Sequence, residues 1–333
     1  MKALIKKLVE AYGPPGHEAQ VRDLVRAEIG NLPDVVSVDA LGNLIAIVKT
    51  KSKSGKRVML SAHMDEIGVI VSHVDERGFA RFLNLGGVNP LTCLGGRVRF
   101  ANGAIGVIGL DARREDPNKP PAFSELFLDF GATSKADCPV QVGDAGGFYR
   151  PLEELGEHRL VAKSMDDRIG VAILIEVMRA LKNSPHEVTF VFSVQEEVGL
   201  RGAATASFGV EAEIGIAVDV TRTGDTPNGP KMAVALGAGA AIKVRDSGML
   251  ADPRIKDLLV RRAREAGIPY QLEILEAGTT DAAAMQISRS GLPAGCVSIP
   301  TRHLHTPSEM VDLRDVQACV KLLVETLKKP IEL

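Results

Sequence analysis

The chain has 333 residues, of which 45% are hydrophobic and 25% are charged, and its formal net charge at pH 7 is -2. This composition is typical of a folded globular protein with one large domain or two ordinary ones, and it excludes a disordered chain. Because acidic and basic residues are mixed without a basic block, we expect no nucleic acid and no anionic membrane as a partner.

The cysteines and the first residues bear on the compartment. The four cysteines are far apart and form no CxxC pair, which predicts reduced thiols rather than disulfides or a structural zinc site: Cys93, Cys138, Cys296 and Cys319. Lys6 and Lys7 interrupt the apolar start, so no signal peptide is expected, and no later run is long enough to span a bilayer. We therefore expect a cytoplasmic protein.

The chain is predicted to begin with two helices. Apolar residues from Leu4 to Val9 recur at helical spacing, glycines and prolines interrupt them after Tyr12, and a second amphipathic run extends from Glu18 to about Ile29. Three short apolar runs then predict strands at Val35–Val38, Leu44–Val48 and Val58–Ala62.

From residue 68 to residue 157 the residue composition and the hydrophobic pattern change. Glycines are frequent, short alternating stretches such as Arg97–Phe100 occur, and no helical period is present, so a small β-barrel or sandwich is predicted. Helix and strand alternate again from Asp166, and a terminal helix is predicted around Val316–Leu327. The predicted fold is α/β: residues 1–67 and 158–333 form one catalytic domain, and residues 68–157 form an inserted β domain.

Acidic and histidine residues follow several of the predicted strands. His63 follows VMLSA, Glu196 and Glu197 follow VTFVFSV and one glutamine, Asp219 follows IGIAV, and His305 lies a few residues after GCVSI. Polar side chains in such folds collect beyond the carboxyl ends of the strands. A set of imidazoles and carboxylates suits divalent ions, and two ions that share a carboxylate are common in hydrolases. The sequence therefore predicts a dinuclear metal hydrolase.

Neighbouring residues suggest how the first ligands are held. Asp65 lies two residues after His63 and could fix the second ring nitrogen of that histidine. Asp166 and Asp167 stand at a helix start, where one aspartate, most simply Asp167, would cap the helix and leave Asp166 free to bridge two ions. Asp281, before an alanine-rich helix, is interpreted as an ordinary cap.

Two choices stay open at the level of spacing. Glu196 and Glu197 are adjacent and would point to opposite sides in extended backbone, so one could bind metal while the other handles protons. His303 and His305 are two residues apart; we expect at most one of them to enter the site, and spacing alone does not choose between them.

The ordered set SAHMDEIG, SMDDRIG, QEEVGLRGA, AVDVT, GTTDA and TRHLHTPSEM, with the β insertion between the first two, resembles the tetrahedral aminopeptidase family, which includes glutamyl and deblocking aminopeptidases. The resemblance extends over nearly the whole chain. It implies a mixed-sheet, dinuclear zinc peptidase domain with an inserted small β-barrel. It also implies two divalent ions, zinc or cobalt: Asp166 would bridge them, His63 and Asp219 would complete one site, and Glu197 and His305 the other.

The resemblance implies the remaining roles as well. Glu196 would be the general base, Asp65 would orient His63, and the family's arginine-x-x-histidine pattern falls on Arg302 and His305. The expected activity is removal of N-terminal residues from short peptides. The inserted domain would mediate homodimer contacts, with six dimers forming a hollow homododecamer.

Two alternatives to an aminopeptidase fit the sequence less well. A glycosidase such as an endoglucanase would need carboxylates on two sides of the sugar, about 5 to 9.5 Å apart, and the chain offers no Trp and only three Tyr for sugar stacking. A catalytically silent, metal-stabilised assembly protein would not need the full set of ligands and base that the sequence retains.

Overall fold

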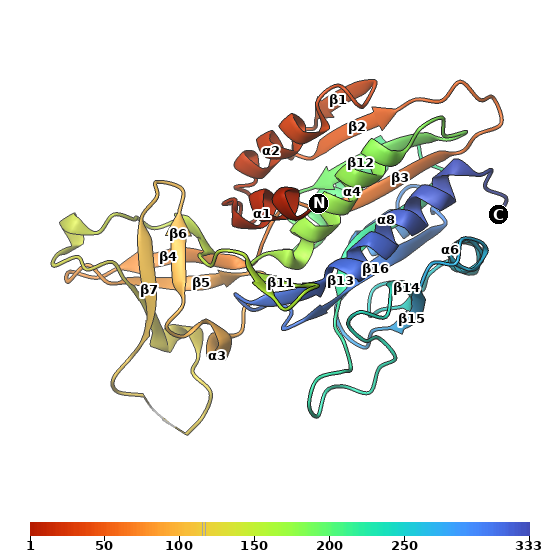
Figure 1. Cartoon of the computed structure of the whole chain (residues 1–333). Helices are drawn as coiled ribbons and strands as arrows, with labels where there is room; N and C mark the ends of the chain where they lie inside the picture. Colours follow the sequence, from red (N-terminus) through yellow and green to blue (C-terminus); the bar gives the residue numbers. More distant parts are fainter. Residues whose placement is uncertain (115, 117) are drawn as a thin grey trace.

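The chain folds into a large helix-covered sheet and a small β-barrel beside it (Figure 1). The structure is a computed structural model that describes residues 1–114, 116 and 118–333. The predicted α/β fold with an inserted barrel is confirmed.

The large sheet is mixed. Its strands run in the order β1-β2-β12-β3-β13-β16-β17-β11-β10, and β14 pairs with β16 and β15. The strands β12, β3, β13 and β16 are mutually parallel and form its centre. Their bounds are β1 Val35–Val38, β2 Leu44–Val48, β3 Arg57–His63, β10 Glu153–Leu155, β11 Arg159–Ala162, β12 Glu187–Ser193, β13 Ile214–Thr221, β14 Ala240–Arg245, β15 Tyr270–Ile274, β16 Ala294–Arg302 and β17 Glu309–Asp312.

Helices cover both faces of this sheet. Their bounds are α1 Lys2–Glu10, α2 Ala19–Ile29, α4 Met165–Ala180, α5 Arg201–Gly209, α6 Pro253–Glu265, α7 Asp281–Gln286 and α8 Leu313–Lys328. Side chains alternate along β3, so Leu60 packs in the main core with α4 and α8, whereas Met59 packs in a second core with α7. Alternation along one strand thus separates a thick helical layer from a thinner one that contains α5 and α7.

Two helices begin at aspartate residues that cap their first turn. Asp312 caps α8 by accepting a hydrogen bond from the backbone NH of Arg314, and Asp252 caps α6 in the same way, with Pro253 at the first helical position. The apolar residues of α1 and α8 fall on one side of each helix and are buried, as their helical spacing predicts.

The barrel is closed by six strands in the order β4-β5-β8-β7-β6-β9. These are β4 Gly68–Val74, β5 Ala80–Leu85, β6 Arg97–Phe100, β7 Ile105–Leu110, β8 Leu126–Asp129 and β9 Ala145–Phe148, with a short helix α3 at Pro90–Cys93. The barrel has its own apolar core, which includes Phe82, Phe100 and Phe148. Strand β10 lies outside it and pairs with β11 in the large sheet.

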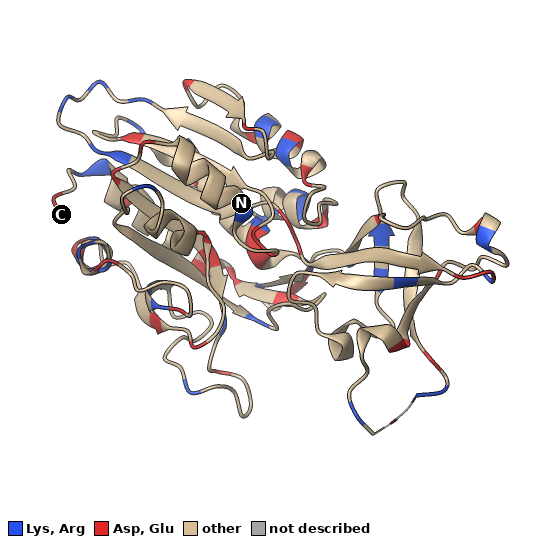
Figure 2. Cartoon of the chain, turned by 180° about the vertical axis from the view of Figure 1, so that it is seen from behind, with Lys and Arg blue, Asp and Glu red and all other residues tan. Residues whose placement is uncertain are grey.

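Acidic segments lie near the junction between the sheet and the barrel, at the carboxyl-terminal ends of the central strands (Figure 2). Among the helices of the described residues, none has both the length and the apolar character needed to cross a membrane.

Candidate metal centre

Register places the first two candidate ligands side by side. Strands β3 and β13 are parallel neighbours in which Ala217 pairs with Ser61. His63 and Asp219 each lie two residues further along, so they come next to each other and on the same face of the sheet, the face that α7 covers. The Nε2 atom of His63 is 3.9 Å from Oδ1 of Asp219.

The two adjacent glutamates follow the next strand of the same sheet. Ser193, the last residue of β12, pairs with His63, and the chain then turns so that Oε2 of Glu196 comes within 3.9 Å of the Nε2 atom of His63. The turn contains residues with positive φ at Gln195 (54°) and Leu200 (56°). Positive φ is uncommon for residues with a side chain and recurs at functional sites, and Ser164, His303 and His305 have it as well.

Asp166 lies between two histidines. Its Oδ1 atom is 2.9 Å from Nε2 of His63, and its Oδ2 atom is 3.1 Å from Nε2 of His305. Nε2 of His305 is in turn 3.6 Å from Oε1 of Glu197. One carboxylate therefore presents a separate oxygen to each half of the cluster, which is the arrangement that a carboxylate bridging two ions requires.

Asp65 contacts both halves of the site. The backbone carbonyl of Asp65 lies 3.1 Å from Nδ1 of His63, closer than the side chain of Asp65, which is 3.5 Å away. The Asp65 carboxylate instead accepts hydrogen bonds from the backbone NH groups of Glu196 and Glu197, at 3.0 Å each. It thereby fixes the turn that carries both glutamates.

Two further carboxylates hold ligand backbones. Glu309 accepts hydrogen bonds from the backbone NH groups of Asp166 and His305, both at 2.9 Å. Asp167 accepts from the backbone NH of His63 at 3.3 Å and from that of Gly170 at 3.1 Å, which caps the first turn of the regular part of α4. Both residues are buried.

The barrel edge also reaches the site. After β5 the chain passes through Gly86 and Gly87, and a Cβ atom at Gly87 would lie 2.2 Å from Nδ1 of His305, while one at Gly86 would lie 2.8 Å from Oε2 of Glu197. Only residues without a side chain allow the backbone to pass this close. The inserted domain thus supplies none of the predicted ligands but packs directly against two of them.

The carboxylates of the site carry opposite pKa shifts. Burial would raise the pKa of Asp166, but hydrogen bonds from His305 and His63 outweigh it and hold that pKa below its usual range. Burial and the charge of Asp166 raise the pKa of Glu197 to about 7. Burial also raises the pKa of Glu196 and of Asp219 well above the usual range.

The histidines shift in response to these acids. Burial alone would lower the pKa of His305, yet the hydrogen bond to Asp166 and the charge of Glu197 raise it to about 10. The pKa of His63 is raised well above its usual value because the charge of Glu196 and the hydrogen bond to Asp166 outweigh burial. Both shifts reflect a concentration of buried negative charge.

The buried cations around the site have other partners. Lys243, whose charge acts on Asp219, donates to Glu273 at 2.5 Å. Lys163 donates to Glu66 at 2.6 Å and to the carbonyl of Ala11, and Arg168 donates to the carbonyls of Leu8 and Gly13. Among the described residues, no lysine or arginine forms an ion pair with the candidate ligands, and buried charges are costly unless they are paired or bind metal.

The donor set fits divalent ions. Ligand atoms of His63, Asp166 and Glu197 lie within 4.8 Å of one another, and so do those of His63, Asp167 and Asp219. Oε1 of Glu197 is buried and accepts no hydrogen bond, as expected of an oxygen that binds metal. Of the two adjacent aspartates, we favour Asp166 as a ligand because both Asp167 oxygens already accept backbone NH groups.

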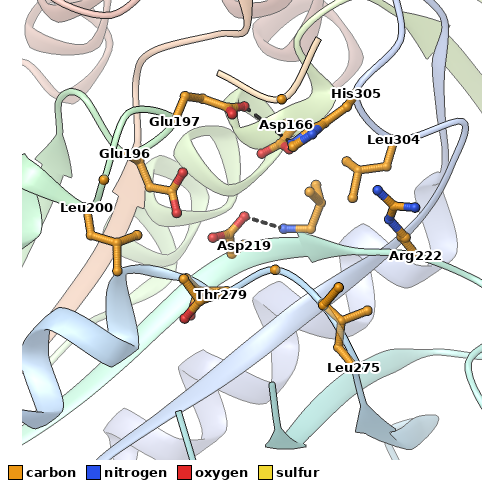
Figure 3. Close-up of a pocket in the computed structure, with 16 residues that line it drawn as sticks. Asp166, Glu196, Glu197, Leu200, Asp219, Arg222, Leu275, Thr279, Leu304 and His305 are labelled. Atoms are coloured by element: carbon orange, nitrogen blue, oxygen red, sulfur yellow. Dashed lines mark hydrogen bonds and ion pairs between the residues drawn. The ribbon is translucent and has the colours of Figure 1, made fainter. Parts of the chain in front are cut away.

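The structure brings together the residues predicted for the site: Asp166, Glu196, Glu197, Asp219 and His305, which Figure 3 shows around the cavity, and His63 and Asp65, which contact them. His303 lies in an adjacent hollow with Arg302 and Thr226. Glu309, which lies in the TRHLHTPSEM segment, is a residue of the site that spacing alone does not predict.

The prediction that Asp281 caps α7 is wrong: Thr280 caps this helix by accepting a hydrogen bond from the backbone NH of Ala282, and Asp281 makes long-range contacts instead. Its Oδ2 atom accepts hydrogen bonds from the hydroxyl groups of Ser61 and Ser193, both at 2.6 Å. These serines lie near the ends of β3 and β12, the strands that lead to His63 and Glu196. No local pattern signals such long-range contacts.

A cavity of about 450 Å³ opens beside the cluster. It is bounded by the candidate ligands on one side and by Leu200, Leu275, Thr279 and Leu304 on the other (Figure 3). A molecule in this cavity would contact any ion held by the ligands, so the arrangement suits metal-assisted hydrolysis of a small substrate.

Comparisons with known proteins agree with this chemistry. Residues 42–322 match the family described as M42 glutamyl aminopeptidase. A lysyl aminopeptidase from Pyrococcus furiosus is 37% identical over 341 residues, covering 98% of this chain and 97% of the relative.

Two solved structures share the fold. The structure of an aminopeptidase from the archaeon Desulfurococcus kamchatkensis superposes with a TM-score of 0.94 at 38% identity, covering 98% of this chain and 94% of the other. The TET1 peptidase of Pyrococcus horikoshii, described as able to assemble into a tetrahedron or a large octahedral shell, gives a TM-score of 0.87 at 29% identity, with coverage of 98% and 99%.

Proposed function

The chain belongs to the M42 glutamyl aminopeptidase family and is a metal-dependent aminopeptidase; from this premise we propose that it removes N-terminal residues from short peptides with two divalent ions, zinc or cobalt. The position of Asp166 is the observation that carries the proposal. Its two oxygens face His63 and His305 at 2.9 and 3.1 Å, so one carboxylate can serve two ions.

The ligands divide into two sets around that bridge. We assign His63 and Asp219 to one ion and Glu197 and His305 to the other. The 3.9 Å separation within the first pair and the 3.6 Å separation within the second support this division. Neutral imidazole and carboxylate are suitable ligands for zinc and cobalt alike.

When bound, the ions would polarise the scissile carbonyl and lower the pKa of water toward about 7. Glu196 is assigned as the general base because its carboxylate lies beside the ligands and lines the substrate cavity. It would accept a proton from the attacking water and return it to the leaving amine, a role worth roughly 10²- to 10⁴-fold in rate.

Asp65 is assigned as a positioning residue. Its backbone carbonyl lies against the ring of His63, and its carboxylate holds the backbone of Glu196 and Glu197. It would therefore keep the base at a fixed distance from the first ion.

Self-association is supported by solved relatives of the TET type, which form large assemblies. We propose that the domain of residues 68–157 forms the contacts within a homodimer and that six such dimers assemble into a homododecamer. Exposed apolar side chains on that domain, at Leu83, Leu91, Val107 and Val142, support an interface there. Light scattering should give a mass near twelve chains that falls toward dimers when metal is removed, whereas a persistent monomer would contradict the assembly.

A cytoplasmic location is proposed on the basis of the thiols. All four cysteines are free, and three of them are buried, which suits a reducing compartment. Fractionation of cells that express the untagged chain should recover it with cytoplasmic markers, and recovery outside the cell would contradict the proposal.

The activity is tested with a panel of aminoacyl p-nitroanilides, short peptides and β-glucans, each assayed after metal removal and after addition of zinc or cobalt. We expect peptide and aminoacyl hydrolysis that depends on added metal. Hydrolysis of β-glucans in place of peptides would contradict the proposal, as would the absence of any turnover in protein that retains two ions.

A further inference from the structure

One arginine on the wall of the substrate cavity has no partner in the part of the chain that the structure describes. Arg222 directly follows β13, three residues after Asp219, and lines the cavity of about 450 Å³. Among the described residues it makes no hydrogen bond, ion pair or ring contact, and its side chain is exposed. Its neighbour Arg302, by contrast, is held by Asp225 at 2.7 and 3.1 Å.

The position of Arg222 makes it available to a bound molecule. Figure 3 shows its side chain beside Leu304, on the wall opposite Glu196 and Leu200. It also lines the adjacent hollow that contains His303. A substrate that extends from the metal ligands across the cavity would therefore meet this guanidinium.

The rest of this wall does not neutralise the arginine. Apart from Arg222, the metal-binding cluster and Glu196, the described residues that line the cavity are uncharged and include Leu275, Ala277 and Thr280. Thr279 lies on the same cavity, and its hydroxyl group is buried without a hydrogen-bond partner. The cavity thus contains an unpaired cation and an unpaired hydroxyl, and both are groups that can donate to an anion.

We propose that Arg222 binds a carboxylate of the peptide substrate and so makes this aminopeptidase selective for substrates that carry one within reach. The proposal rests on the aminopeptidase function proposed above. A guanidinium presents two parallel NH groups that match a carboxylate, and such charge-assisted pairs are about twice as strong as neutral hydrogen bonds. A lysine or arginine side chain at the same place would be repelled.

The carboxylate can come from two parts of a substrate. It can belong to the side chain of an N-terminal Asp or Glu, or it can be the C-terminal carboxylate of a dipeptide or tripeptide. The relative from Pyrococcus furiosus is named for a basic N-terminal residue, lysine. The names of relatives therefore do not decide the charge preference of this chain.

Two matched substrate pairs distinguish the sources. The ratio of kcat/KM for Glu-p-nitroanilide to that for Gln-p-nitroanilide reports a side-chain carboxylate, since neither substrate has a free C-terminus. The ratio for Leu-Gly to Leu-Gly-amide reports a C-terminal carboxylate. Loss of a charge-assisted hydrogen bond lowers kcat/KM by roughly 10- to 100-fold. We therefore expect Arg222→Gln to lower at least one of the two kcat/KM ratios by about that factor.

Two more variants complete the test. Arg222→Lys keeps the charge without the paired NH groups and should lower the same ratio by less. Arg261→Gln is the matched control, because Arg261 is exposed on α6 and also has no described partner; it should change neither ratio.

The outcomes separate this proposal from the function on which it rests. If wild-type protein loaded with metal hydrolyses none of the four substrates, the aminopeptidase function fails. If it hydrolyses them and both ratios are the same in wild type and Arg222→Gln, the function stands and the role of Arg222 is refuted.

Discussion

Glu309 accepts a hydrogen bond of 2.9 Å from the backbone NH of Asp166, the carboxylate that faces both halves of the metal site. Its other oxygen accepts from the backbone NH of His305. One buried side chain on β17 therefore positions two candidate ligands that are far apart in sequence.

Glu309→Gln should weaken metal binding. A glutamine offers one carbonyl oxygen, and its amide group would face the second backbone NH instead of accepting from it. Loss of such a supporting contact typically costs about 10- to 100-fold in metal affinity. Titration with Co²⁺, followed by its visible absorption, measures this. Glu153→Gln on exposed β10 is the control, and equal affinity in both variants would refute the role of Glu309.

Asp65→Asn should lower kcat by roughly 10- to 100-fold while the ion at His63 is retained, by analogy with other supporting residues. The backbone carbonyl that faces His63 is unchanged, but an asparagine can accept only one of the two NH groups from Glu196 and Glu197. Metal content by mass spectrometry and steady-state kinetics decide this. If the variant instead loses the ion at His63 but keeps a normal turnover per bound pair of ions, Asp65 supports metal binding and not the position of the base.

Glu196→Gln should keep both ions and lose turnover by at least about 10²-fold, the low end expected for a general base. Glu197→Gln should instead lower metal occupancy at one position, since the buried Oε1 atom of Glu197 accepts no hydrogen bond and is free to bind an ion. The two variants serve as controls for each other. If Glu196→Gln retains near-normal kcat, or if Glu197→Gln keeps two tightly bound ions, the roles are wrongly assigned.

Removal of metal should make stability fall as pH rises from 5 to 9. The pKa of Glu197 is raised from 4.5 to about 7 and that of His305 from 6.5 to about 10. Each group holds its proton more tightly in the folded protein, so the associated stability is lost as pH rises between the unfolded and the folded pKa. Both shifts act in the same direction.

Thermal unfolding of the chelator-treated protein at several pH values measures this effect. Saturating zinc should reduce or reverse the fall of the unfolding temperature with rising pH, because metal competes with protons for the same groups. A metal-free protein whose unfolding temperature rises across this range would contradict the assignment.

The sequence predicted the strands that carry the ligands because burial on both faces leaves a clear apolar run. The strand predicted at Val58–Ala62 lies within β3, which ends at His63, and the apolar run before Asp219 lies within β13. The polar residues after those runs are the ones that meet in space. The general rule for the carboxyl ends of parallel strands was sufficient to group them.

The supporting contacts could not be predicted in the same way. Glu309 accepts from the backbone NH of Asp166, 143 residues away, and Asp281 accepts from the hydroxyl of Ser193, 88 residues away, and no spacing rule links such partners. The backbone carbonyl of Asp65, and not its carboxylate, lies closest to the His63 ring. The carboxylate accepts hydrogen bonds from backbone NH groups in the turn after β12 instead. Gly87 was unremarkable in sequence, and its contact with His305 depends on how the barrel packs.

The central claim is that Asp166 bridges two ions. The most direct measurement is anomalous diffraction at the zinc absorption edge from crystals grown with Zn²⁺. We predict two peaks about 3.5 to 4 Å apart, one bound by Oδ1 of Asp166 with His63 and Asp219, the other by Oδ2 with Glu197 and His305. A single peak at saturating zinc, or two peaks with Asp166 bound to only one of them, would contradict the account.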